Sequence, residues 1–142
     1  MVSAVIEEVP VLAPEAVDQA DGFASLVVRL VHLAGGRIET WAFETVALVL
    51  VREGALDAAG VSFGCDYDLN IRSRELRRGY VRAVDIGWLI ANGREMWLGR
   101  EPAGTERPAD ETREEAAAIA RSVLELPRAE LERCARHLLL AE

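Results

Sequence analysis

A strict alternation of apolar and polar residues over positions 61–72 constrains the fold more than any other stretch of the chain. Every odd position there holds an apolar or aromatic residue, and every even position holds a small or polar one. Because successive side chains of a β-strand point to opposite faces, a period of two predicts a half-buried strand. On such a strand Asp66, Asp68 and Asn70 share one face, which leaves two interpretations: a solvent-facing surface, or a weak cation site or polar cavity lining.

Two incomplete motifs overlap this stretch. The segment GVSFG at 60–64 has the G-x-S-x-G spacing of a serine hydrolase, but a nucleophile elbow needs a helix directly after the serine. The alternation continues past Ser62, so we expect a strand residue rather than a nucleophile. The segment DYDLN at 66–70 matches the start of an EF-hand loop, whose sixth and twelfth positions should be Gly and Glu. Those positions are Ile71 and Arg77, so an EF-hand is excluded.

Asn92-Gly93 predicts a β-hairpin, because both central positions of a type I′ turn need a positive φ and this pair supplies it. Pairing outward from the turn places Trp88 opposite Trp97, at a position where cross-strand side chains approach most closely. A helix over residues 73–91 is the alternative, since arginines and Asp85 could form its polar stripe.

Gly35-Gly36 predicts a second hairpin on the same grounds, with His32 opposite Glu39. Enrichment in Val, Thr, Trp and Phe favours strands in this region. The alternative is a pair of helices over 14–33 and 38–53, each ending near a glycine.

The pattern becomes helical after residue 100. Residues 101–109 read as a polar connector, and 110–142 as two helices separated by Pro127, with Asp110 as the first N-cap. Residues 2–12 predict one more strand. We therefore expect one α+β domain over 1–142, with 1–100 mainly β-sheet: an antiparallel meander of five or six strands, flat or curled into a half-barrel, with two C-terminal helices packed on one face.

All sixteen basic residues are arginine. Without lysine, Schiff-base enzymes, Walker A phosphate binding and the protein-kinase lysine are excluded. The composition points to a bacterial host with a genome rich in G and C. Cys65 and Cys134 lie far apart, which gives neither a disulfide framework nor a metal-ligand spacing. No metal and no cofactor are expected.

The net charge of −8 disfavours binding to nucleic acid or to an anionic membrane. Residues 1–12 lack the basic and apolar regions of a secretory signal, and no apolar stretch is long enough to cross a bilayer. We therefore expect a cytoplasmic location.

Residues 71–100 form a basic island between acidic flanks, with seven arginines, three acids and a net charge of +4. Its centre consists of Arg72, Arg74, Arg77, Arg78 and Arg82. These arginines either pair with acids elsewhere in the fold or form a patch for an anion or a partner, since the guanidinium fork matches carboxylate and phosphate groups.

Candidate catalytic residues are scattered. His32 and Glu39 are the one pair whose expected register sets an imidazole against a carboxylate, and Asp66, Asp68 and Asp85 are further candidate acids. Asp85 interrupts an apolar stretch, so it is either exposed or buried in a cavity where it could act as a general acid or base. The candidate ligand-binding residues are aromatic: Trp41, Tyr67, Tyr80, Trp88 and Trp97.

Two functions fit these observations, and the sequence leaves catalysis open. The first is a small acidic interaction protein, regulatory, immunity-like or accessory, that binds a protein partner without catalysis, through a sheet face or the helical pair; a homodimer is a related expectation. The second is a half-barrel enzyme or binding protein for an apolar small molecule, with an aspartate as general acid or base.

Overall fold

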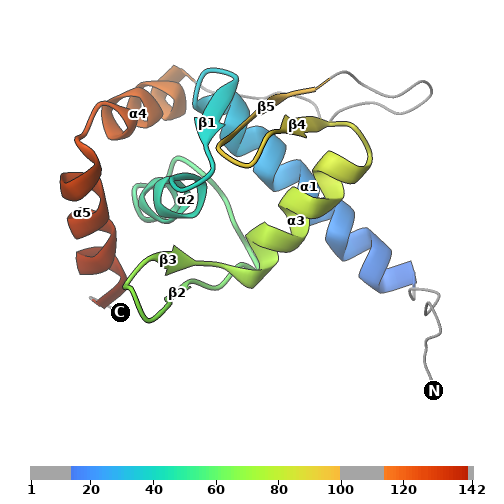
Figure 1. Ribbon diagram of the computed structural model, residues 1–142, viewed down its shortest axis with the longest axis horizontal. Helices are drawn as coiled ribbons and strands as arrows, with labels where there is room; N and C mark the ends of the chain where they lie inside the picture. Colours follow the sequence, from blue (N-terminus) through green and yellow to red (C-terminus); the bar gives the residue numbers. More distant parts are fainter. Residues whose placement is uncertain (1–13, 100–113, 141–142) are drawn as a thin grey trace.

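The computed structural model describes residues 14–99 and 114–140, with side chains described from residue 22 in the first segment and from 115 in the second. Its elements follow one another along the chain as shown in Figure 1. They are α1 (Pro14–Leu33), β1 (Arg37–Glu39), α2 (Phe43–Arg52), β2 (Gly64–Cys65), β3 (Ile71–Arg72), α3 (Arg74–Asp85), β4 (Leu89–Ala91), β5 (Glu95–Leu98), α4 (Glu114–Leu124) and α5 (Arg128–Leu140).

The expected meander of five or six strands, and its half-barrel variant, are wrong. The described residues form an α+β fold with five helices, a three-stranded antiparallel sheet of order β1-β5-β4, and the two-stranded hairpin β2–β3. Helices alternate with strands along the chain instead of following them. The strand expected at 2–12, the connector at 101–109 and the N-cap Asp110 lie outside the described residues.

The second hairpin, expected around Gly35-Gly36, is wrong, because the residues before these glycines form helix α1. Glycine can adopt the positive φ that is needed both at a helix end and in a hairpin turn, so the pattern fits either structure. Gly35 has φ +94°, and the N–H groups of Gly35 and Gly36 donate to the carbonyls of His32 and Val31 at 3.0 and 2.9 Å. These two bonds make a Schellman motif, which closes a helix. The helical alternative over 14–33 is therefore confirmed, and α2 starts at Phe43 because 37–39 pair with β5 as a strand.

The strand expected over 61–72 is also wrong. It is two strands of two residues each, joined by a turn over 66–70 in which Asp66 N–H donates to the Asn70 carbonyl at 3.0 Å and Leu69 has φ +66°. The Asp66 carboxylate accepts the N–H groups of Asp68 and Asn70, both at 2.9 Å. This local side-chain bonding competes with an extended strand and stabilises the turn.

The hairpin expected around Asn92-Gly93 is present as β4–β5, but the register is shifted by two residues. Ile90 pairs with Trp97 and Ala91 with Met96, so Trp88 is not opposite Trp97. Gly93, with φ +91°, is the first residue of the loop between Asn92 and Glu95, and the Asn92 Oδ1 accepts the N–H groups of Arg94 and Glu95 at 3.0 Å. Since the shift is an even number, the side chains keep the faces that the alternation predicts.

The core has two halves on either side of α2. On one side α1 crosses α3 so closely that a Cβ at Gly79 would lie 2.3 Å from the Phe23 carbonyl oxygen. On the other side α4 and α5 pack against α2 (Figure 1). The helical pair flanking Pro127 is thus present, but it covers a helix rather than the face of a large sheet. Within the segments that can be described, no helix is long and apolar enough to span a bilayer.

Candidate functional site

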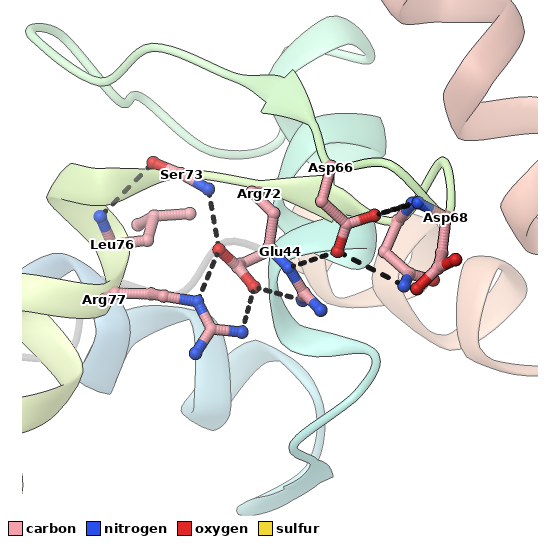
Figure 2. A network of polar contacts seen from close by, with 8 residues as sticks. Glu44, Asp66, Asp68, Arg72, Ser73, Leu76 and Arg77 are labelled. Carbon is pink, nitrogen blue, oxygen red and sulfur yellow. Dashed lines mark hydrogen bonds and ion pairs between the residues drawn. The ribbon is translucent and has the colours of Figure 1, made fainter.

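A fully buried carboxylate organises the centre of the fold. Glu44, in the first turn of α2, is completely inaccessible to solvent. Its Oε2 accepts the Ser73 N–H at 2.6 Å and Arg77 Nε at 3.2 Å, and its Oε1 accepts Arg77 Nη2 at 2.9 Å and Arg72 Nη1 at 3.2 Å (Figure 2). Arg77 therefore binds both oxygens, the geometry in which Arg–carboxylate pairs are strongest. The buried charge is neutralised and saturated with donors.

Arg72 extends this network to the β2–β3 turn. Its Nε donates to Asp66 Oδ2 at 3.1 Å while its Nη1 reaches Glu44, as Figure 2 shows. The Asn70 N–H, the strongest of several donors to Asp66, holds the pKa of that carboxyl below its usual value. Asp66 is thus an acceptor that locks the turn and ties it to the start of α2.

Ser62, the central residue of the G-x-S-x-G motif, anchors a loop. Its N–H and its hydroxyl both donate to Glu75 Oε1 at 3.0 Å. The backbone bond from Ser62 is the main cause of the lowered pKa of Glu75. A carboxylate stabilised in this way is a poorer base for activating a hydroxyl, and the serine stands ahead of β2, not on a strand-to-helix elbow.

The arginines of the basic island divide into two groups. Arg72 and Arg77 bind Glu44, and Arg82 faces Asp85 at 3.8 Å. Arg74 and Arg78 are exposed, and in the described part of the chain neither forms an ion pair with a carboxylate. The prediction of an anion or partner patch therefore stays open for these two residues.

Arg74 and Arg78 share the outward side of α3 with two exposed valines. Val81 is 64% exposed and Val84 is 37% exposed, whereas Leu76 and Ala83 on the opposite side of the helix are buried. We refer to Arg74, Arg78, Val81 and Val84 as the α3 outer face. Their spacing of three and four residues places them along one side of the helix, and Asp85, four residues after Val81, ends the same side and faces Arg82.

A groove of about 560 Å³ lies between α1, residues 57–60 and α3. Phe23 and Leu26 supply apolar surface, and Arg29 and Arg78 are its basic residues. Two other grooves, of about 530 and 480 Å³, are lined in part by Trp41 and by Trp97 respectively.

The predicted catalytic residues do not converge. His32 lies in the last turn of α1, whereas Glu39 lies in β1 opposite Glu95, so the expected register between them is wrong. Asp66 locks the turn, Asp68 is exposed within it, and the Asp85 side chain is 74% exposed at the end of α3. Asp85 is therefore not in the cavity that a role as general acid or base would require.

The predicted aromatic residues are dispersed as well. Tyr67 is fully exposed at the turn, Tyr80 packs on Phe43 at 5.7 Å between ring centroids, and Trp88 is buried. The Trp41 ring lies under the Arg128 guanidinium at 4.2 Å, and Trp97 belongs to the sheet. Trp41 and Trp97 line different grooves.

Glu44 was not identified from the sequence, although two signals point to it. It is the lone acid within the apolar segment FETVALVLV, and the basic island 71–100 has an excess of arginine that needs an acid elsewhere. Cys65 and Cys134 are free thiols, and no group of three metal-ligating side chains occurs among the residues described.

A scan of protein-family models and searches of curated proteins and of solved structures found no match to this chain. Any function must therefore be argued from the geometry above.

Proposed function

We propose that this protein is a non-catalytic binding module that docks a protein partner on the α3 outer face. The observation that supports this best is the division of the arginines. The fold uses Arg72 and Arg77 to neutralise Glu44, and it leaves Arg74 and Arg78 in solvent beside exposed valines. Arginine next to apolar surface is the combination enriched at protein interfaces.

Helix α3, which carries this face, is held in place by its contacts with α2 and α1. The bidentate Arg77–Glu44 pair fixes α3 to α2, and the contact at Gly79 fixes it to α1. Ser73 caps the helix, since its Oγ accepts the Leu76 N–H at 3.3 Å. A helix that is capped at its start and held by two other helices loses little conformational freedom on binding, which favours affinity.

The chemistry of the face favours an acidic protein partner over nucleic acid. Val81 and Val84 gain from burial against apolar side chains, whereas a phosphate backbone offers them nothing. The net charge of −8 also repels polyphosphates. The partner that fits is a helix or loop in which Asp or Glu residues flank apolar side chains, so that carboxylates meet Arg74 and Arg78.

Site-specific crosslinking in the native host tests the proposal. A photoreactive p-benzoylphenylalanine replaces Val81, and a matched control carries it at the exposed Ser122 on α4. We expect an adduct with one protein from position 81 only, and we expect Arg74→Glu with Arg78→Glu to abolish it. The charge reversals Arg121→Glu with Arg133→Glu, on exposed positions of α4 and α5, should leave the adduct unchanged.

Two results would overturn the proposal. The first is an adduct at Val81 that survives reversal of both arginines. The second is tight binding of labelled duplex DNA by the wild-type protein that the same reversal abolishes, which would reassign the face to nucleic acid.

The half-barrel pocket of the small-molecule hypothesis is missing from the described sheets. A small-molecule site on this chain needs another cavity.

A further inference from the structure

We propose that the groove between α1, residues 57–60 and α3 binds a small organic anion. Arg29 and Arg78 hold its carboxylate or phosphate, and Phe23 and Leu26 contact its apolar body. This site goes beyond the proposed protein docking, because its ligand is a small molecule and most of its residues lie off the α3 outer face.

The groove has the size and the walls of a ligand site. Its volume of about 560 Å³ falls within the ~300–1,000 Å³ of known ligand pockets. Gly22, Leu26 and Arg29 follow one side of α1, and α3 contributes Glu75 and Arg78. The third wall is made of small residues after Asp57, namely Ala58, Ala59 and Gly60. A Cβ added at Gly22 or Gly60 would meet no atom within 4 Å, so the space beside both glycines is open.

The groove is lined by two carboxylates, Asp57 and Glu75, and by two arginines, which are the groups that can hold an anion. Arg29 and Arg78 are exposed, and neither forms an ion pair with a carboxylate in the segments described. Glu75 stays ionised, because the two hydrogen bonds that its Oε1 accepts from Ser62 lower its pKa, so it offsets part of the positive charge of the arginines. Asp57 stands on the third wall, not on the helices that carry the arginines, and it disfavours an anion placed against that wall. Two guanidinium groups beside an apolar floor suit a ligand with one anionic end and one apolar end.

Arg78 belongs both to this groove and to the α3 outer face. If the proposed function holds, an anion bound to Arg78 competes with the partner's carboxylate, and by linkage each ligand weakens the other. This coupling rests on the proposed function, whereas anion binding itself does not.

Titrations of the full-length protein with four small probes, followed by backbone amide resonances, test the site. Phenyl phosphate and benzoate combine an apolar ring with a phosphate or a carboxylate, inorganic phosphate lacks the ring, and benzyl alcohol lacks the charge. We expect one or both of the aromatic anions to bind and to shift resonances of residues 22–29 and 57–60. We expect inorganic phosphate and benzyl alcohol to bind at least ~10-fold more weakly than the better aromatic anion, because each lacks half of the recognition.

The variant Arg29→Gln should weaken the better aromatic anion by ~10-fold, the loss expected for one charge-assisted contact. The matched control Arg121→Gln, at an exposed position of α4, should not change the affinity. An unchanged melting temperature in both variants shows that the fold is intact.

The proposal is overturned if neither aromatic anion binds, if Arg29→Gln binds the better one as tightly as wild type, or if benzyl alcohol binds as tightly as that anion. The two proposals can fail separately. Val81→Asp should disrupt the partner contact and leave the aromatic anions bound, whereas Arg29→Gln should do the reverse.

Discussion

Replacing Glu44 by Gln removes one charge from the centre of the fold and changes almost nothing in its volume. The amide oxygen can take the position of Oε2, where it still accepts the Ser73 N–H and Arg77 Nε. The amide nitrogen then takes the position of Oε1, where it faces two donors, Arg72 Nη1 and Arg77 Nη2. Two charge-assisted hydrogen bonds are therefore lost.

The expected loss in the free energy of unfolding follows from these contacts and from the exposure of the two arginines. Two hydrogen bonds to charged groups contribute roughly 3–6 kcal/mol when neither donor finds a replacement. The side chains of Arg72 and Arg77 are 38% and 47% exposed, so each guanidinium can turn partly toward water. We therefore expect Glu44→Gln to lower the free energy of unfolding by about 2–3 kcal/mol.

Urea unfolding, followed by circular dichroism and by tryptophan fluorescence, measures this loss. The matched control is Glu132→Gln, which removes a surface pair with Arg128 at 3.3 Å and should cost less than ~1 kcal/mol. A cycle that combines Glu44→Gln with Arg77→Met should show coupling of at least ~1 kcal/mol. A loss below ~0.5 kcal/mol for Glu44→Gln would refute the claim that this carboxylate organises the core.

Four further substitutions test other features of the structure. Gly79→Ala should lower the free energy of unfolding by at least ~2 kcal/mol, because its Cβ would meet the Phe23 carbonyl. Gly22→Ala places its Cβ in open space and should raise the free energy of unfolding by up to ~1 kcal/mol. Equal effects of the two substitutions in urea unfolding would contradict the close crossing of α1 and α3. Leu69→Gly should raise stability by roughly 1 kcal/mol because φ is +66° there, and a destabilised variant would show that the exposed leucine makes an important contact. The pKa of Asp66 lies below its usual 3.8, so its contribution is complete well above pH 3.8 and is lost as the pH falls through the folded value. Asp66→Asn should therefore be less stable than wild type at pH 7 and converge with it in acid, and a constant difference at every pH would contradict this role.

The sequence predicts the C-terminal helices and the β4–β5 hairpin because both depend on local signals. A proline between two amphipathic segments marks the break between α4 and α5, and an Asn-Gly pair marks the hairpin. The register of β4 against β5 could not be predicted from the sequence, because Gly93 can take either the first or the second central position of a two-residue turn.

The errors in the first half of the fold arise where one local pattern fits two structures. A glycine with positive φ serves a hairpin turn and a helix C-terminus equally well, so Gly35 could not distinguish them. The β-branched Val27 and Val31 favour strands by propensity, but both are fully buried in α1, and packing outweighs propensity. The alternation over 61–72 was genuine, yet Asp66 could bond to its own turn, which no count of alternating residues reveals.

The central network depends on residues far apart in sequence. Glu44 meets Arg72 and Arg77 across 28 and 33 positions. A single sequence shows an excess of arginine in one segment and a lone acid in another, but only the packing of α2 against the start of α3 pairs them. The same packing decides which arginines of this segment pair with Glu44 and which stay exposed.

The affinity of the protein for the partner identified by crosslinking at Val81 tests the central claim most directly. Isothermal titration should show binding at least ~30-fold weaker for Arg74→Glu with Arg78→Glu, since each reversal sets like charges together at the interface. The control reversals Arg121→Glu with Arg133→Glu should change it by less than ~3-fold, as expected for charges outside the contact. Equal affinities for the two double variants would contradict docking on the α3 outer face.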